Sequence, residues 1–498
     1  MSAAYTELES RFKRLTLIRD ALGVLEWDFQ TLMPSGGANA RSEQLATLSV
    51  MAHELLSDPR TGELLQRAAE MNGGLDAWQQ GNLRSMTREW RHASAVPGAL
   101  VEARSKANSE CELLWRTARP ANDFKGLLPS LQRVLDLARE VAAIKAEALG
   151  LDPYDALMDQ YEPGARQDEI TPLFDRLAAV LPDLIAQVID KQARGPAIKK
   201  LSGHFPAATQ MALARRLMEA VGFDFNHGRL DTSAHPFCSG VPDDIRMTTR
   251  WNEADFLPGL MGVLHETGHA MYERGLPRDW RIQPVGQALG MSVHESQSLI
   301  VEMQASRSRE FISWLAPRAA EAFGGSGPEW AADNFVRIYS KVERGLIRVD
   351  ADEVTYPAHV ILRYRLEQAL IGGDLRLADL PGAWAEGMKA LVGIVPPDDK
   401  DGCLQDIHWP GGGWGYFPSY TLGAMTAAQL FDAARRAKPE IPAALGHGDF
   451  SPLMGWLREN VHSKGSLMTA RELLIASTGR PLDPDVFLRH LRTRYLDA

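Results

Sequence analysis

The stretch DFLPGLMGVLHETGHAMYERG, residues 255–275, decides the fold and the chemistry of this chain. Its apolar residues recur at three- and four-residue steps, which predicts a buried helix. Asp255 can cap the start of this helix, Pro258 is tolerated in its first turn, and Gly275 follows its end. Within it, His265 and His269 are four residues apart, so both imidazoles lie on one face and can converge on a metal ion.

Glu266 lies beside the first of these histidines. On a helix it faces the open side of the metal, where a carboxylate can take a proton from a water molecule that the metal activates. A purely structural zinc site has no use for this carboxylate. The alternative is a polar helix with two exposed histidines, and the apolar flanks argue against it. Since a chance H-E-x-x-H is expected in roughly one such sequence in fifty, a third ligand is needed to decide.

The third ligand is expected downstream, on another helix. The stretch VHESQSLIVEMQ offers His294, Glu295 and Glu302. Glu295 follows His269 by 26 residues, which leaves room for a loop and an antiparallel helix. Glu295 and Glu302 share a helix face, from which His294 is offset. We favour Glu295 because Glu302 sits in an apolar stretch, but spacing alone does not decide between the three.

Helical periodicity also dominates the rest of the chain, which predicts a mainly α fold. Strand-like runs are few, and RMTTRW at 246–251 is the best of them. No Gly/Pro-rich break has the composition of a flexible linker, so we expect one domain over 1–498, in which a helical cap (roughly 1–200) covers the catalytic part (201–498). The predicted helical segments are 5–26, 41–72, 125–149, 169–195, 207–221, 285–322 and 361–371.

Composition excludes several classes of protein. Hydrophobic residues make up 45% and charged residues 24%, as in ordinary globular proteins. The formal net charge of −10 argues against nucleic acid or an anionic membrane as partner. The three cysteines are far apart and form no CxxC pair, which favours a reducing compartment. The N-terminus has no signal-peptide pattern and no apolar run is long enough to span a membrane, so we expect a cytoplasmic protein.

Six short motifs then reveal a resemblance to the thermostable carboxypeptidases of the Taq carboxypeptidase type, a family of metallocarboxypeptidases. The resemblance spans nearly the whole chain and includes WDFQTLMP (27–34) and YDALMDQYEPG (154–164). In chain order the motifs are HPF (235–237), DIRMT (244–248), HETGH (265–269), HESQ (294–297), IRVDAD (347–352) and GCLQDIHW (402–409).

This resemblance implies that Glu295 is the third ligand, beside His265 and His269, of one zinc ion per chain, for which cobalt can substitute. It implies a large helical metallopeptidase fold that is neurolysin-like, with a long substrate groove and a small β element near the active site. It also implies a homodimer that removes single residues from the free C-termini of peptides.

A carboxypeptidase must recognise a terminal carboxylate, for which arginine is the best partner. Arg348 is our first choice and Arg246 the second; alternatively, each pairs with acidic neighbours, namely Asp350 and Asp352 or Asp243 and Asp244. In similar proteins the DIRMT stretch is thought to limit the groove.

The tetrahedral intermediate also needs a hydrogen-bond donor. His408 and Tyr420 are candidates, and the Gly-rich run PGGGWGYFPSY (410–420) could fold over a substrate backbone. Tyr420 could equally be a core aromatic residue. His235 could support the site or simply pack beside it.

Together these observations predict a metallocarboxypeptidase with Glu266 as general base. A neurolysin-like endo-oligopeptidase would share every metal residue but would not need an arginine for a terminal carboxylate. An aminopeptidase is disfavoured because no Gly-x-Met-Glu-Asn stretch is present to bind a free amine. A non-catalytic protein stabilised by metal would have no need of Glu266.

Overall fold

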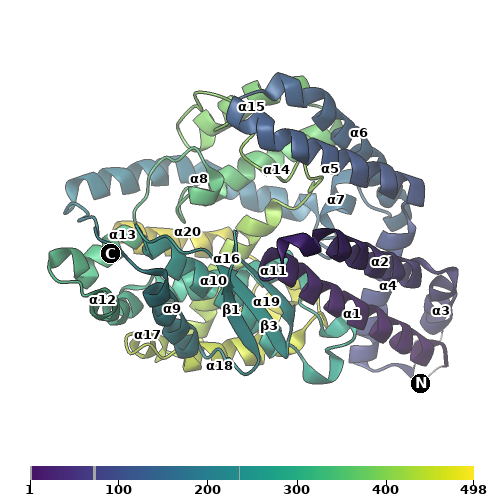
Figure 1. Cartoon of the computed structure of the whole chain (residues 1–498), viewed down its shortest axis with the longest axis horizontal. Helices are drawn as coiled ribbons and strands as arrows, with labels where there is room; N and C mark the ends of the chain where they lie inside the picture. Colours follow the sequence, from purple (N-terminus) through teal and green to yellow (C-terminus); the bar gives the residue numbers. More distant parts are fainter. Residues whose placement is uncertain (1–2, 71–73, 235, 498) are drawn as a thin grey trace.

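The structure, a computed structural model, describes residues 3–70, 74–234 and 236–497. It confirms a mainly α fold with one small sheet (Figure 1). The helices are α1 (Ala3–Gln30), α2 (Ala38–Ser57), α3 (Pro59–Glu70), α4 (Ala77–Ser94), α5 (Gly98–Ala121), α6 (Phe124–Leu149), α7 (Pro153–Met158), α8 (Gln167–Arg194), α9 (Ala207–Val221), α10 (Leu257–Gly275), α11 (Gly290–Leu299), α12 (Arg309–Phe323), α13 (Ala332–Tyr339), α14 (Tyr356–Gly372), α15 (Leu380–Leu391), α16 (Pro418–Ala437), α17 (Ile441–Leu445), α18 (Ser451–Asn460), α19 (Ala470–Thr478) and α20 (Pro484–Arg492).

The sheet has strand order β1-β3-β2, from β1 (Gly228–Thr232), β2 (Phe237–Val241) and β3 (Asp244–Thr249). β1 runs parallel to β3, and β2 runs antiparallel to it. The strand predicted at 246–251 is therefore present, but it begins and ends two residues earlier, at Asp244 and Thr249. β2 and β3 both pack against α10, so the sheet supports the helix that carries the H-E-x-x-H motif.

Two predicted helices are interrupted. The segment 41–72 divides into α2 and α3 at Asp58, whose backbone is not helical (φ −53°, ψ 127°). Pro59 follows Asp58, and a proline sterically disfavours the helical conformation of the residue before it. The segment 285–322 contains α11, then a π-helix over Ile300–Ser306, then α12, which starts where the Ser308 side chain accepts a hydrogen bond from the amide of Phe311. π-Helical turns are frequent at functional sites.

The ends of α10 differ slightly from the prediction. The helix begins at Leu257, and Phe256 rather than Asp255 occupies its N-cap position. The Asp255 carboxylate still accepts a hydrogen bond from the Leu257 amide at 3.1 Å. Gly275 is the last residue of the helix instead of the residue after it.

Three hydrophobic cores hold the chain together. One is built by residues of α1–α4; a second by α5–α8 with α14, α15 and α20; a third by α9–α13 with the sheet and α17–α19. α16 contributes to the second core through Leu422 and Met425 and to the third through Ala427 and Leu430, so it forms a wall common to both. The predicted division into a cap over roughly 1–200 and a catalytic part stays an interpretation.

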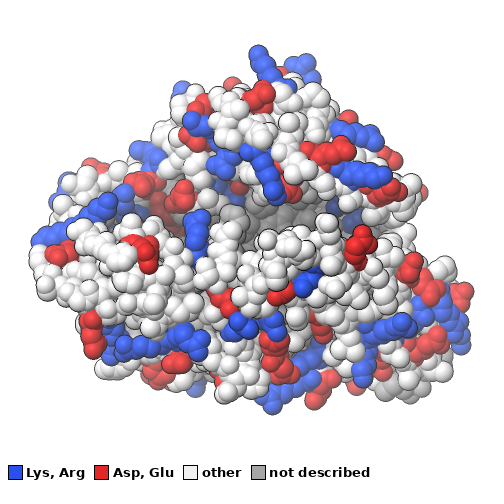
Figure 2. Space-filling view, in the orientation of Figure 1, with Lys and Arg blue, Asp and Glu red and all other residues white. Residues whose placement is uncertain are grey.

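The molecule is hollowed between these groups of helices. In Figure 1, α5, α6, α14 and α15 lie above, while α1, α2, α10 and the sheet lie below. Figure 2 shows a hollow between the two parts. In the described chain no helix is both long and apolar enough to cross a membrane. Cys111, Cys238 and Cys403 are free thiols.

Candidate metal centre and active site

α10 and α11 bring His265, His269 and Glu295 together. The Glu295 Oε2 atom lies 3.7 Å from His265 Nε2 and 3.6 Å from His269 Nε2. Within the described ranges, these three side chains are the one group of histidine, cysteine and acidic residues close enough to hold a metal ion, with their ligand atoms all within 4.8 Å of one another. Tetrahedral ligands about 2 Å from one ion lie about 3.3 Å apart, so only small adjustments are needed.

Two glycines allow this close approach. A Cβ atom on Gly268 would fall 2.4 Å from the Gln297 carbonyl oxygen and 2.6 Å from the Ser298 Cα, both in the backbone at the end of α11. A Cβ on Gly423 of α16 would fall 2.8 Å from Cγ of Glu295. Any larger residue at either position would push α11 or Glu295 away from the histidines.

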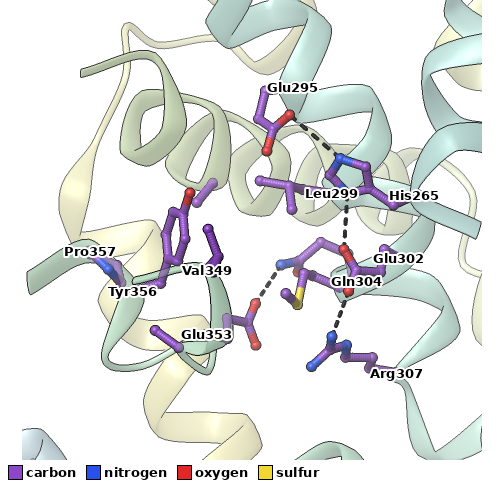
Figure 3. Close-up of a pocket in the computed structure, with 13 residues that line it drawn as sticks. His265, Glu295, Leu299, Glu302, Gln304, Arg307, Val349, Glu353, Tyr356 and Pro357 are labelled. Carbon is purple, nitrogen blue, oxygen red and sulfur yellow. Dashed lines mark hydrogen bonds and ion pairs between the residues drawn. The ribbon is translucent and has the colours of Figure 1, made fainter. Parts of the chain in front are cut away.

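Glu302 lies behind His265 rather than beside Glu295. Its Oε2 atom is 3.0 Å from His265 Nδ1, and Arg307 binds its other oxygen at 2.5 Å (Figure 3). Burial opposes the charge of Glu302, but Arg307 and the hydrogen bond to His265 hold its pKa below the usual value. The π-helix therefore presents Glu302 to the nitrogen of His265 that faces away from Glu295.

His294 occupies the corresponding place behind His269. Its Nδ1 atom lies 2.7 Å from His269 Nδ1, and its Nε2 atom lies 2.9 Å from Glu273 Oε1. Both of the other third-ligand candidates, Glu302 and His294, thus contact the histidines from behind.

The donor set fits a divalent cation. Two imidazoles and one carboxylate are ligands that zinc takes in catalytic sites. Burial lowers the pKa of His265, but Glu295 and Glu302 outweigh it and raise the pKa to about 10. The carboxylates of Glu295 and Glu302 therefore favour a positive charge beside His265, and a bound cation supplies such a charge.

Glu266 is buried beside these residues, with 8% of its surface exposed. Burial raises its pKa to about 7 against the opposing effect of His265. A carboxyl group of this pKa can both accept and donate a proton near neutral pH.

His408 and Tyr420, which lie 12 residues apart, meet in the structure. His408 Nε2 is 3.3 Å from the Tyr420 hydroxyl, and the Tyr416 ring stacks on His408. Burial and the charge of Arg348 lower the pKa of His408 to about 4, so this imidazole is neutral at pH 7. Burial raises the pKa of Tyr420 against the opposing effect of Arg348, and the carboxylate of Glu295 adds to the increase.

Arg348 is buried, with 4% of its surface exposed. It pairs with neither Asp350 nor Asp352, so that alternative is wrong. Its Nε and Nη2 atoms donate to Asp406 Oδ1 at 3.0 and 2.7 Å, and Nη1 donates to the Tyr356 hydroxyl at 2.9 Å. Arg363 donates to the other oxygen of Asp406 at 2.6 Å. Two guanidinium groups thus share one carboxylate, and one positive charge within this group is unbalanced.

Arg246 is bound by its neighbour, as one alternative predicted. Its Nη2 atom donates to Asp244 Oδ2 at 2.7 Å, and its guanidinium lies over the Trp27 ring at 4.4 Å. Asp243 instead binds Arg274 and Arg281. His235 lies outside the described residues.

A cavity of about 240 Å³ lies beside the candidate metal ligands (Figure 3). Figure 3 shows Tyr356 with its hydroxyl turned towards Glu295. The same hydroxyl accepts a hydrogen bond from Arg348, so Tyr356 lines the cavity and also contacts the buried arginine. The residues that line it are His265, Glu295, Leu299, Glu302, Met303, Gln304, Arg307, Val349, Ala351, Glu353, Tyr356, Pro357 and Ala424.

Several members of this site were not predicted from the sequence. Asp406 and Arg363 fix Arg348, yet their separation from it in sequence gives no local signal. Tyr356 follows the IRVDAD motif directly and could have been suspected from that position. Glu273 is four residues after His269 on the same helix, so the face it shares with His269 could have indicated it.

The chain matches the family model described as carboxypeptidase Taq (M32) metallopeptidase over residues 7–495. It is 39% identical to thermostable carboxypeptidase 1 of Thermus thermophilus, covering 99% of this chain and 98% of that protein. Among solved structures, it resembles Trypanosoma cruzi metallocarboxypeptidase 1 with a TM-score of 0.97 and 40% identity over 99% of both chains. It also resembles the M32 carboxypeptidase from Deinococcus radiodurans, with a TM-score of 0.93 and 34% identity, over 100% of this chain and 99% of that one.

These matches run along essentially the whole chain and confirm the resemblance drawn from the six motifs. They give no support to the endo-oligopeptidase alternative. The chain belongs to the carboxypeptidase Taq (M32) family and is a metallocarboxypeptidase, a peptide hydrolase.

Proposed function

We propose that this enzyme uses one zinc ion, held by His265, His269 and Glu295, to remove single residues from the free C-termini of peptides. One observation carries the proposal: a single cavity is lined by two of the three ligands, His265 and Glu295, and by Tyr356. Tyr356 in turn accepts a hydrogen bond from the buried Arg348. When bound, the ion would polarise the scissile carbonyl and lower the pKa of a water molecule. Cobalt can take the place of zinc, because it accepts the same nitrogen and oxygen ligands.

Glu266 is the general base in this proposal. It accepts a proton from the attacking water and later delivers it to the departing amine. Its pKa of about 7 suits both steps. The Tyr420 hydroxyl donates a hydrogen bond to the oxyanion, a role that its 3.3 Å contact with His408 Nε2 supports.

Arg348 anchors the terminal carboxylate. A guanidinium has five N–H donors, and the contacts within the described chain use three of them. One donor remains on each terminal nitrogen, which is the arrangement that binds both oxygens of a carboxylate. The unbalanced charge of the Arg348–Asp406–Arg363 group adds electrostatic attraction for an anion. Arg246 stays the second choice, and a supporting role for His235 stays a prediction.

Three further expectations complete the proposal. The peptide substrates must have a free C-terminus. The family resemblance supports a homodimer. A cytoplasmic location is supported by the three free thiols, since disulfides persist in oxidising compartments.

The test is mass spectrometry of products from a peptide ladder offered with free and with amidated C-termini. We expect successive loss of single C-terminal residues from the free peptides and little cleavage of the amidated ones. Equal cleavage of both, at internal bonds, would replace the exopeptidase proposal with the endo-oligopeptidase one.

A further inference from the structure

The two histidines of the HETGH motif are supported from behind in different ways. Both turn Nε2 towards Glu295, so their Nδ1 atoms are free for other contacts. His265 meets a carboxylate directly, that of Glu302. His269 meets a second imidazole, that of His294, which in turn meets the carboxylate of Glu273.

Hydrogen-bond chemistry fixes the direction of this chain of contacts. As a carboxylate, Glu273 can only accept, so Nε2 of His294 donates to it. A metal ion bound by Nε2 of His269 uses the lone pair of that nitrogen, so the one proton of the neutral His269 imidazole lies on Nδ1. In the metal-bound site, Nδ1 of His269 therefore donates across the 2.7 Å contact and Nδ1 of His294 accepts.

The chain of contacts also joins the two helices of the site. Glu273 is four residues after His269 on α10, and His294 precedes Glu295 on α11. The His269 and His294 rings lie 4.5 Å apart between centroids, and Tyr272 packs edge-on against His294 at 5.5 Å. The rings therefore have fixed orientations, and the contact holds the helix that carries Glu295 against the helix that carries the histidines.

We propose that His294 and Glu273 are positioning residues that select the metal-binding tautomer of His269 and hold its ring in place. The proposal rests on the proposed ligand set and deepens it: His294 acts on the metal through His269, without being a ligand. Partners of this kind typically change metal affinity by 10–100-fold when they are removed.

The experiment measures zinc affinity by competition with a chromophoric chelator and records the visible spectrum of the cobalt-loaded protein. His294→Phe keeps a ring of similar shape but removes the acceptor, and we expect a 10–100-fold loss of zinc affinity. His294→Asn places an amide oxygen near the former Nδ1 position and should restore much of the affinity. The cobalt spectrum should change in the phenylalanine variant and return towards wild type in the asparagine variant.

Glu273→Leu gives a second reading that does not depend on packing around the imidazole. The Glu273 side chain is 23% exposed, so a leucine can be accommodated. It should weaken zinc binding severalfold in a protein that melts like wild type. Affinity and cobalt spectra that match wild type in both His294→Phe and Glu273→Leu would overturn the proposal.

His269→Ala separates this proposal from the ligand assignment. If His269→Ala loses zinc while His294→Phe keeps wild-type affinity, the positioning role is wrong and the ligand set stands. If His269→Ala itself keeps wild-type zinc affinity, the ligand set fails, and the positioning role fails with it.

Discussion

Replacing Gly268 with alanine tests whether the metal site depends on the close approach of α10 and α11. The new Cβ would lie 2.4 Å from the Gln297 carbonyl oxygen and 2.6 Å from the Ser298 Cα, and neither backbone atom can rotate away. Restoring contacts of roughly 3.5 Å requires α11 to move by about 1 Å. Glu295 is three residues before Ser298 on this segment and would move with it.

The expected magnitude has two parts. Overpacking of this kind lowers the free energy of unfolding by about 1–3 kcal/mol. Metal ligands tolerate displacements of only about 0.2 Å, so a shift of about 1 Å should reduce zinc affinity at least tenfold. Chelator competition measures the affinity, and denaturant unfolding of the metal-free protein measures the stability.

Gly262→Ala is the matched control, because Gly262 lies on the same helix and a Cβ there would meet nothing within 4 Å. It should stabilise the protein by up to about 1 kcal/mol, since alanine is the better helix former, and leave zinc affinity unchanged. If Gly268→Ala binds zinc as tightly as Gly262→Ala and is equally stable, the metal site does not depend on the close approach of α10 and α11.

Three further predictions follow from the geometry of the site and its surroundings. Glu266→Gln should bind zinc and peptide normally but lose about 10²–10⁴ in kcat, measured on one preparation; a kcat near wild type would exclude Glu266 as the base. Arg348→Ala should lower kcat/KM for free peptides by on the order of a hundredfold, whereas Arg246→Ala should have a smaller effect if Arg348 is the anchor; equal losses would reverse this order of preference. Asp159 is buried, which opposes its charge, but hydrogen bonds and charges from His92 and Arg88 hold its pKa well below the usual value. Because folding lowers the pKa of Asp159, the ionised carboxylate stabilises the folded protein above about pH 4, and this stabilisation is lost as the pH falls further. In urea unfolding, Asp159→Asn should therefore lower the free energy of unfolding by about 3 kcal/mol at pH 7 and by progressively less below pH 4. A loss that does not vary with pH would contradict this prediction.

The sequence predicted the parts of the site that depend on local spacing. His265, Glu266 and His269 follow from the helical repeat, because four residues return a side chain to the same face. Spacing alone could not identify Glu295 as the third metal ligand, because Glu302 lies on the same helix face two turns later. The structure separates the two through the side of His265 that each contacts.

The sequence could not predict contacts that depend on how distant segments pack. Asp406 binds Arg348 across 58 residues, and nothing in the periodicity of either segment indicates it. Asp350 and Asp352 were the alternative partners for Arg348 because they are its neighbours in the sequence. The π-helix was missed for a different reason: an apolar repeat over 285–322 has the same appearance whether or not one turn widens.

α16, which faces two cores at once, restricts how the length of this chain can change during evolution. Each residue inserted into a helix rotates everything beyond it by about 100°. One insertion before Leu422 would therefore turn the residues of α16 away from both cores together and would displace Gly423 from Glu295. Related chains should therefore vary in length in the loops around α16. An insertion within α16 should occur only together with a deletion less than one helical turn away, which restores the original faces of the helix.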